Sequence, residues 1–412
     1  MKVILTIFVL FLLLSNISIS QQGWVVQSNS VNSKSWSVFF SDESNGWIPY
    51  NNGTVLNTNN AGVNWNSISP TPGGYLFGCY FLTPTTGWIT GISGSIKKTT
   101  DGGSTWTPQT SNTTSHIFKI QFLNQDTGFA IGGNGFTNGV VLKTTNSGTS
   151  WTLSNSISTQ ALSFGFFLNP MRGWAVGTAG TVTRTTDGGS NWTTTYMSGN
   201  PELRGIYFVN PDTGWLVGGF PSTIKKTTDG GANWTAQTPG VSAYLLSVKF
   251  TDENTGWVTG EDGTILHTTN GGALWSTQTS NTTKDLYSAF FVNQTTGWAV
   301  GDSGVILKTS SGGVLAIGDN DQVIPNTFSL SNNYPNPFNP TTTITYNLPL
   351  KSFVSLKVFD MLGQEVESLV NGFQDAGFQS IVWDATNVTS GMYFYKLSTE
   401  KYTSVKKMIL LR

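Results

Sequence analysis

The feature that most limits how this chain can fold is a repeat of about 41 residues. The segment KTTDGGSTWTPQ, which starts at Lys98, returns with small changes at Arg184, Lys226 and His267. Its acidic or amide residue recurs in steps of 41 to 45 residues, and a degenerate seventh copy carries Ser311. The six well-formed copies place this residue at Asn60, Asp101, Asn146, Asp187, Asp229 and Asn270. A fixed period of this length is typical of folds built from stacked units.

Each repeat reads as four short strands separated by turn residues. In the fifth repeat the strands are LRGIYFV, GWLVGG, TIKKTT and NWTAQT. Four strands in about 40 residues indicate one blade of a propeller. The aromatic residue of the second strand occurs seven times, at Trp47, Trp88, Phe129, Trp174, Trp215, Trp257 and Trp298. We therefore predict an all-β chain with a seven-bladed β-propeller over residues 21–313.

The last blade lacks one of its strands. A Trp follows each well-formed turn by five residues, but the seventh copy has Ala316 at that position. Stepping back 41 residues from Trp65 reaches Trp24, near the start of the chain. The sequence therefore predicts that an N-terminal strand completes the last blade and closes the ring, which also protects the strand edges.

The recurring TTDGG..W segment has a local structural explanation. An Asp or Asn side chain can accept hydrogen bonds from backbone N–H groups of its own turn, and the glycines tolerate positive φ. Asn replaces Asp in three of the six copies, a change that a turn tolerates and a metal ligand or catalytic acid does not. The segment resembles the Asp-box of sialidase-type propellers. We therefore interpret the six residues as structural.

Composition excludes several classes of function. Charged residues are 10% of the chain and the formal net charge is -1, so no basic stripe suits a nucleic acid backbone. The single cysteine, Cys79, lies in the apolar strand pattern LFGCYF and is expected in the core. The two histidines, His116 and His267, are too few and too far apart to indicate a metal site. The sequence predicts no metal and no cofactor.

Residues 1–20 have the pattern of a secretory signal peptide. Lys2 precedes the short apolar run from Val3 to Leu14, and small residues stand before Gln21. The apolar run is shorter than the roughly 20 residues that a bilayer requires, and no later segment has the pattern of a membrane-spanning helix. We predict export and no transmembrane segment.

Length variation between the repeats falls in one class of loop, between the second and third strands. In a propeller these loops share one face with the starts of the inner strands, whereas the Asp-box turns lie on the other face. Variable loops on one face mark it as the binding face. Its candidate binding residues are Phe136, Arg204, Phe220, Glu261, Asp262 and Asp302. Arg204 is expected at the mouth of the central channel, in a column with Trp36, Phe77, Phe118, Ser163, Leu246 and Tyr287.

An enzymatic reading is the alternative. Glu261 with Asp302 would suit acid–base chemistry at a sugar. A sialidase needs several arginines for the substrate carboxylate, and the propeller has only Arg172, Arg184 and Arg204. The sequence shows no nucleophile–base motif and no phosphate loop. We therefore predict a non-enzymatic protein, with no catalytic residue.

Over residues 23–313 the TGWxVGxxGTIxxTTDGGxxW units resemble the photosystem II assembly and stability factor-like propellers. The resemblance covers the whole predicted ring. It implies a non-enzymatic scaffold that holds partner proteins.

After a polar linker at residues 314–325, residues 326–412 predict a small Ig-like β-sandwich. The segment YPNPFNP from Tyr334, together with VFDMLGQEV, WDAT, SGMYFYKL and the basic end at Lys406 and Lys407, resembles the C-terminal sorting domain of type IX secretion. The resemblance implies that the type IX machinery is a partner of this segment. It also implies outer-membrane export, often with removal of the tail.

The sequence as a whole predicts a secreted or bacterial cell-surface propeller that binds a protein or a surface partner and is not an enzyme. The alternative is a carbohydrate-binding or glycoside-hydrolase-like propeller of the sialidase type. In either case the ligand, an unknown protein or surface glycan, would bind the face that carries the variable loops.

Overall fold

The computed structural model describes residues 23–69, 74–135, 137–154, 158–314, 327–333 and 335–411. The predicted signal peptide, the candidate residue Phe136, Tyr334 of the YPNPFNP segment and nearly all of the predicted linker lie outside these residues. Contacts divide the chain into two compact units, with the division between residues 316 and 317. No helix within the described ranges has the length and hydrophobicity needed to cross a bilayer.

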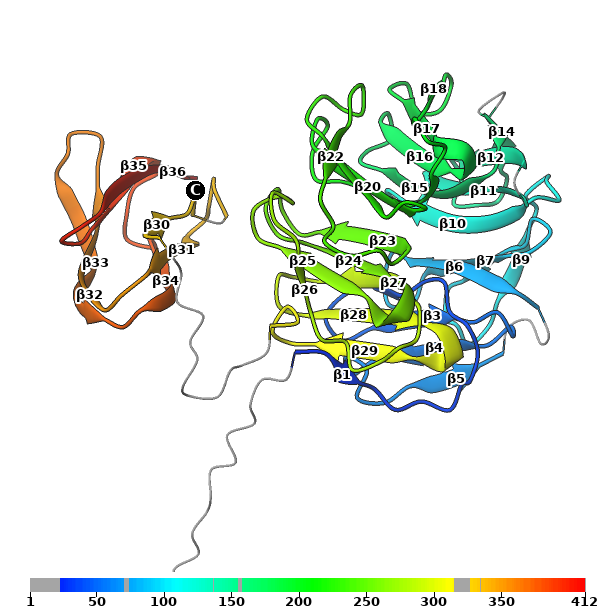
Figure 1. Ribbon diagram of the computed structural model, residues 1–412, viewed down its shortest axis with the longest axis horizontal. Helices are drawn as coiled ribbons and strands as arrows, with labels where there is room; N and C mark the ends of the chain where they lie inside the picture. Colours follow the sequence, from blue (N-terminus) through cyan, green and yellow to red (C-terminus); the bar gives the residue numbers. More distant parts are fainter. Residues whose placement is uncertain are drawn as a thin grey trace, which may run out of the picture. The chain divides into compact units, whose positions relative to one another are not determined.

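Seven antiparallel sheets of the first unit follow one another in chain order around a central axis (Figure 1). Blade one contains β2 (Phe39–Phe40), β3 (Gly46–Pro49), β4 (Val55–Thr58) and β5 (Asn66–Ile68), and blade two contains β6 (Leu76–Phe81), β7 (Gly87–Gly91), β8 (Ile96–Thr99) and β9 (Thr107–Gln109). Blade three contains β10 (His116–Phe122), β11 (Gly128–Asn134), β12 (Thr137–Thr144) and β13 (Thr152–Leu153), with β14 (Ser158–Gln160) paired to β12. Blade four contains β15 (Leu162–Phe167), β16 (Gly173–Gly177), the 3-10 turn η1 (Thr178–Gly180), β17 (Thr181–Thr185) and β18 (Thr193–Tyr196).

The remaining three blades repeat the arrangement. Blade five contains β19 (Glu202–Phe208), β20 (Gly214–Gly219), β21 (Thr223–Thr227) and β22 (Thr235–Gln237). Blade six contains β23 (Leu245–Phe250), β24 (Gly256–Gly260), η2 (Glu261–Gly263), β25 (Ile265–Thr268) and β26 (Ser276–Thr277). Blade seven contains β27 (Leu286–Phe291), β28 (Gly297–Gly301), η3 (Asp302–Gly304), β29 (Ile306–Thr309) and the N-terminal strand β1 (Val25–Val26). The predicted fold of seven blades is confirmed.

The N-terminal strand closes the ring as the sequence predicted. Val25 pairs with Lys308 and Val26 with Leu307, so β1 is the outermost strand of blade seven and lies beside β29 in Figure 1. Trp24 is buried, and its ring meets that of Phe291 edge-on at 5.8 Å between centroids. Trp24 thus takes the place that the Trp after each Asp-box takes in the other blades.

Neighbouring blades are joined by stacked aromatic rings. The aromatic residue of each second strand stacks on a Phe that ends the inner strand of the next blade, with centroids 3.5 to 3.7 Å apart. The Trp after the Asp-box meets the same Phe edge-on, at 5.9 to 6.1 Å in six blades. Large buried rings in these geometries contribute both hydrophobic burial and favourable ring electrostatics. The aromatic residues recur at a constant spacing in the repeats, and this spacing places each of them in the same contact between neighbouring blades.

Each Asp-box turn is held by its own side chains. In blade four the buried Thr185 hydroxyl donates to the Asp187 carboxylate at 2.9 Å and accepts the backbone N–H of Gly189 at 2.9 Å. The same carboxylate accepts the backbone N–H of Asn191 at 2.9 Å. The hydrogen bonds from Asn191, followed by that from Thr185, lower the pKa of Asp187 to about 2. Asn60, Asn146 and Asn270 accept the equivalent backbone N–H in their turns.

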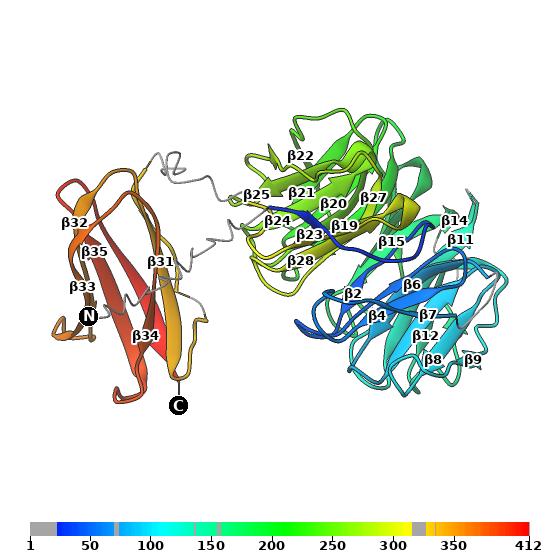
Figure 2. The same cartoon turned by 90° about the horizontal axis from the view of Figure 1, so that it is seen from below.

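The second unit is a two-sheet sandwich (Figure 2). One sheet contains β30 (Ser329–Leu330), β31 (Thr341–Leu348) and β34 (Gly377–Asp384), and the other contains β33 (Glu365–Gln374), β32 (Ser352–Phe359), β35 (Gly391–Ser398) and β36 (Thr403–Leu410). Trp383 and Tyr395 are buried in its core. Phe338, from the YPNPFNP segment, donates its N–H to Ile409 and accepts from Leu411, so this segment fastens the last strand.

Candidate binding face and central cavity

Hydrogen bonds assign the loops of the propeller to two faces. The loops between second and third strands meet the starts of the inner strands: Glu261 donates its backbone N–H to Tyr244, and Asp302 donates to Asp285. The Asp-box turns instead meet the loops between first and second strands, as where Gly188 donates to Met171. We call the first of these the variable-loop face and the second the turn face.

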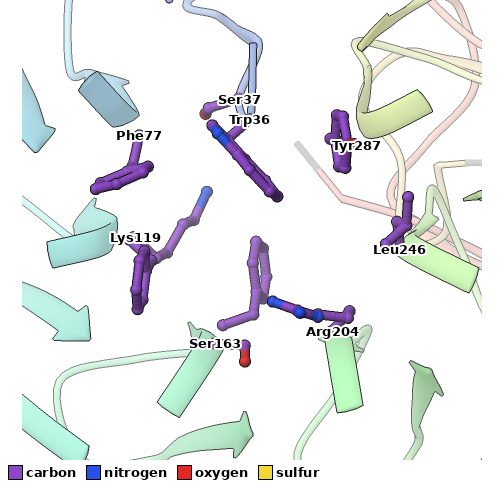
Figure 3. Close-up of a pocket in the computed structure, with 10 residues that line it drawn as sticks. Trp36, Ser37, Phe77, Lys119, Ser163, Arg204, Leu246 and Tyr287 are labelled. Atoms are coloured by element: carbon purple, nitrogen blue, oxygen red, sulfur yellow. The ribbon is translucent and has the colours of Figure 1, made fainter. Parts of the chain in front are cut away.

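A cavity of about 100 Å³ lies at the centre of the propeller, where the inner strands begin (Figure 3). Its wall consists of Trp36, Ser37, Phe77, Phe118, Lys119, Ser163, Phe164, Arg204, Leu246 and Tyr287. Seven of these are the predicted column at the starts of the inner strands, one from each blade, and we call them the upper ring. All seven are partly exposed, so solvent reaches the cavity.

Backbone bulges explain why the upper ring points inward. In six inner strands the register shifts by one residue, and the unpaired residue at each shift belongs to the ring: Phe77, Phe118, Ser163, Arg204, Leu246 and Tyr287. A bulge re-aims a side chain and is common beside functional sites. The residue after each bulge is small in most blades, and the exceptions are Lys119 and Phe164, which also line the cavity.

Tyr244 connects candidate residues from two blades. Its hydroxyl accepts from Nε of Arg204 at 3.3 Å and donates to the Glu202 carbonyl at 3.2 Å. The Arg204 guanidinium also pairs with the Glu202 carboxylate. Phe220 meets the Tyr244 ring edge-on at 5.2 Å and is 77% exposed. Gly219 permits this contact, because a Cβ there would lie 2.4 Å from the Tyr244 ring.

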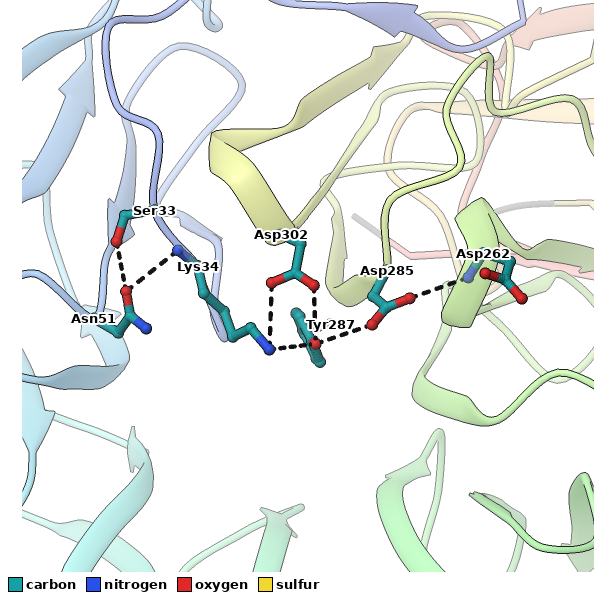
Figure 4. A network of polar contacts seen from close by, with 7 residues as sticks. All are labelled: Ser33, Lys34, Asn51, Asp262, Asp285, Tyr287 and Asp302. Atoms are coloured by element: carbon teal, nitrogen blue, oxygen red, sulfur yellow. Dashed lines mark hydrogen bonds and ion pairs between the residues drawn. The ribbon is translucent and has the colours of Figure 1, made fainter.

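A network of polar contacts occupies the same face at blades six and seven (Figure 4). Lys34, which precedes the first inner strand, donates to the Tyr287 hydroxyl at 2.6 Å and pairs with Asp302 at 3.2 Å. The Tyr287 hydroxyl donates to Asp285 at 3.1 Å, and Asp285 accepts the backbone N–H of Asp262 at 3.1 Å. Burial, followed by the charges of Asp302 and Asp285, raises the pKa of Tyr287.

The two carboxylates that the enzymatic alternative requires have different neighbours. Asp302 is paired with Lys34, and its second oxygen lies 3.4 Å from the Tyr287 hydroxyl. Burial, and then the charge of Asp285, raises the pKa of Glu261. Among the described residues, no hydrogen bond or ion pair joins Glu261 to Asp302, and the hydrogen-bond partners of the Glu261 backbone are Tyr244 and Thr264.

Lys119, in the cavity wall, and Lys249 both lie against the Phe164 ring, and among the described residues neither has an acidic partner. The Lys119 ammonium lies 5.0 Å from the Phe164 ring centroid, and the Lys249 ammonium lies 5.7 Å from it. Lys249 also lies 5.1 Å from the Tyr207 ring. Burial lowers the pKa of both lysines, and burial together with the charge of Lys119 lowers the pKa of Lys249 to about 7.

The cysteine and the two histidines have local packing or hydrogen-bond partners. Cys79 is fully buried, as expected, and burial raises its pKa to about 12. His267 stacks on Trp257 at 4.9 Å, and burial lowers its pKa to about 4. His116 accepts the backbone N–H of Ser93 at 3.1 Å. Within the described ranges, no three His, Cys, Asp or Glu side chains come together as a metal-binding group.

The sequence-derived candidates fall into two groups on the variable-loop face. Arg204 and Phe220 meet through Tyr244, while Asp262 and Asp302 meet through Asp285 and Tyr287. Sequence reasoning missed Lys34, Lys119, Tyr244, Lys249 and Asp285. Of these residues, only Lys249 left a signal, which appears when the inner strands are compared with one another: it stands at a position that is aromatic in five of the other blades.

Comparisons with known proteins agree with this fold. Residues 70–144, 143–239, 197–280 and 239–315 match the family described as photosynthesis system II assembly factor YCF48, and residues 332–411 match the secretion system C-terminal sorting domain. Because the first family covers more than half of the chain, the chain belongs to it. The sorting domain at the C-terminus indicates secretion to the cell surface. No curated protein matches the sequence significantly.

Several solved structures share the propeller fold. A structure of YCF48 bound to D1 peptide is 19% identical with a TM-score of 0.60, and the match covers 70% of this chain and 97% of that one. Virginiamycin B lyase from Staphylococcus aureus is 16% identical with a TM-score of 0.60, over 70% of this chain and 98% of that one. PorZ, a surface component of the type-IX secretion system of Porphyromonas gingivalis, is 11% identical with a TM-score of 0.50, over 94% of this chain and 59% of its own. Since one of these propellers is a lyase, the fold alone is compatible with binding and with catalysis.

Proposed function

We propose that this protein is an exported binding module that captures a protein or a surface partner through its variable-loop face and performs no catalysis. The observation that carries the proposal is the cavity of about 100 Å³ at the centre of that face, with aromatic and aliphatic side chains in its wall. Concave sites with apolar walls and a few placed polar groups are typical ligand sites. The C-terminal sorting domain would deliver the propeller to the cell exterior.

Phe220 adds support for a partner on this face. It is 77% exposed, and its backbone φ of 46° lies in the left-handed region, where a bulky residue is uncommon. Conformations of this kind cluster at ligand clamps and switch regions. Exposed aromatic side chains are also frequent anchors in protein interfaces. The relative named as bound to D1 peptide makes a peptide or protein partner the first candidate.

The pairing of Asp302 with Lys34 favours binding over acid–base chemistry. A glycosidase requires two carboxylates flanking the scissile bond, one of them free to take or give a proton. Turnover by the intact protein on a panel of glycans would overturn the non-enzymatic part of the proposal and favour the carbohydrate-active alternative.

Capture of outer-membrane and secreted proteins by the purified chain tests the binding face. The variant combines Arg204→Ala with Phe220→Ala, and Phe136→Ala is added in a second version. The matched control replaces Val63 and Leu274 by Ala, because both are exposed apolar residues of Asp-box turns on the turn face. We expect capture to fall at least about tenfold for the first variants and to persist in the control. Equal capture by all of them would place the partner elsewhere.

A further inference from the structure

Lys119 and Lys249 are the most unusual charged residues of the propeller. Among the described residues, the ion pairs are made by Lys34, Arg204, Lys351 and Lys357, and neither ammonium group of Lys119 and Lys249 is within hydrogen-bond distance of a partner. Both lie against the Phe164 ring, at 5.0 Å and 5.7 Å. Two neighbouring cations without a counter-charge are costly in a poorly solvated site. A bound ligand that carries negative charge would offset this cost.

The ring itself does not need these lysines. The residue after the upper-ring residue is Ser37, Gly78, Gly205, Ser247 or Ser288 in five blades, and blade three has Lys119 there. At the position opposite the second-strand aromatic residue, five blades have Phe or Tyr and blade six has Lys249. Blades with small or aromatic residues at these places still stack, so packing is not the reason for the charge.

The residues around the two lysines indicate which chemical groups the ligand would carry. Lys119 points into the cavity, as do Trp36 and Phe77 (Figure 3), and Phe118 also belongs to the cavity wall. Arg204, at the same level, is already paired with Glu202. Lys119 therefore places a positive charge beside a largely aromatic wall. This geometry suits a carboxylate on a small apolar or aromatic body.

We propose that the central cavity binds an organic carboxylate, with its aromatic or aliphatic body against the upper ring and its carboxylate between Lys119 and Lys249. The inference rests on the proposed function, because the cavity opens on the variable-loop face. A chain end or an acidic side chain of the partner would supply such a group. Free small acids of the same shape should bind as well, which allows a test without the partner.

Benzoate and its neutral isostere benzamide are suitable probes for isothermal titration calorimetry on the full chain. A buried cavity of about 150 Å³ holds benzene, and this cavity of about 100 Å³ is open to solvent on one side. We expect benzoate to bind at least about tenfold more tightly than benzamide, because only benzoate neutralises the lysines. Equal binding of the two probes, or binding of neither, would overturn the proposal.

The matched variants are Lys119→Met with Lys249→Met, and Lys225→Met on β21 as control. The double variant should lose the preference for benzoate, and the control should keep it. Because the double variant removes two uncompensated charges, its thermal midpoint should rise, which distinguishes loss of binding from loss of folding. A double variant that keeps the preference would refute the role of the lysines. If it does not fold, the wild-type comparison of the two probes still decides.

Binding should also depend on pH. The groups around Lys249 are Lys119 on β10 and Tyr207 on β19, with Tyr80 on β6 at the corresponding position and the paired Arg204 above. With a pKa of about 7, Lys249 is mostly protonated at pH 6 and mostly neutral at pH 8. Benzoate affinity should therefore be up to about tenfold higher at pH 6. A flat pH profile would count against Lys249.

The two proposals can fail separately. Absence of benzoate binding together with capture that still depends on Arg204 and Phe220 would refute only the carboxylate site. Benzoate binding together with capture that is indifferent to those residues would refute only the partner face.

Discussion

Trp298 in blade seven stacks on Phe40 in blade one, with ring centroids 3.5 Å apart and ring planes 14° apart. Both rings are buried. An equivalent stacked pair, Trp on Phe in five cases and Phe129 on Phe167 in the sixth, joins each of the other neighbouring blades, so the joint between the two ends of the propeller is equivalent to the joints within it. The propeller is therefore closed by the same type of contact that joins its other blades. The contribution of this contact to stability can be tested at one position.

Replacing the Trp298 indole by a smaller aromatic side chain should be tolerated, whereas removing the aromatic side chain should not. Blade three has Phe129 at this position, and it stacks on Phe167 at 3.6 Å. The Trp298 Nε1 has no hydrogen-bond partner among the described residues, so Phe forfeits none. We expect Trp298→Phe to cost less than about 1.5 kcal/mol and Trp298→Ala about 3–5 kcal/mol. Urea unfolding measures both, and equal losses would contradict a role for stacking.

The closing strand should matter through Trp24 and little through its neighbour. Trp24 is 1% exposed, and its Nε1 donates to Gln278 at 2.9 Å. Val26 lies on the same strand and is 53% exposed. We expect Trp24→Ala to lower the free energy of unfolding by about 3–5 kcal/mol and Val26→Ala by no more than about 0.5 kcal/mol. If both variants unfold at the wild-type urea concentration, β1 does not hold the ring closed.

An amide should replace the carboxylate of an Asp-box. Asn146 accepts the backbone N–H of Ser150 at 2.9 Å, as Asp187 accepts that of Asn191. Asp187→Asn should therefore keep the thermal midpoint within about a degree, and Asp187→Ala should lower it by a few degrees. Differential scanning calorimetry gives both values. A large loss in the Asn variant would point to a role for the charge.

The same turns should make the propeller sensitive to acid. The pKa of Asp101, Asp187 and Asp229 is about 2 in the folded chain, below the ordinary value of 3.8. The folded state thus favours the ionised form, and the resulting stability is complete above pH 3.8 and is lost as the pH falls through about 2. Replacing all three by Asn should flatten the decline of the thermal midpoint over this interval. An unchanged decline would assign acid sensitivity to other groups.

Lys249 should act on stability in the opposite interval. Its folded pKa of about 7 lies below the ordinary value of 10.5, so the folded state disfavours the charged form. Below pH 7 the folded chain bears the full penalty, and stability rises with pH between about 7 and 10.5. The stabilising effect of Lys249→Met should therefore be largest near pH 6 and shrink toward pH 10. Urea unfolding at several pH values checks this, with Lys225→Met measured in parallel as the control.

The propeller architecture could be predicted because the length of the repeat and its four-strand pattern are those of a propeller blade. A Trp at residue 24 and none at residue 316 is sufficient to infer that β1 joins blade seven. The column of Arg204 and Tyr287 could also be predicted from the alignment of the repeats. The bulges that turn this column inward were not predicted, because a bulge interrupts the alternation of side chains, and in such short strands of mixed apolar, small and charged residues this interruption is recognised only once the pairing is known.

The contacts on the variable-loop face were beyond sequence reasoning for a different reason. Tyr244 precedes an inner strand and belongs to no motif, yet it touches Arg204 and Phe220 because the start of β19, the loop after β20 and the segment before β23 meet there. Lys34 forms an ion pair with Asp302, although nearly the whole sequence of the propeller lies between the two residues. In IFKIQF and LLSVKF the lysines look like ordinary solvent-facing strand positions. Only closure of the propeller places the lysine-bearing side of these two inner strands against a narrow central channel.

The pairing of β1 with β29 sets an order of events during synthesis. Val25 and Val26 leave the ribosome early, but their partners Leu307 and Lys308 are made last in the propeller. Six blades can form from local segments, while the earliest residues must wait unpaired until the final hairpin arrives. Completion of the domain is thus a late, single event that depends on nearly its full length, so a truncated product is left with an open blade and two unprotected edges.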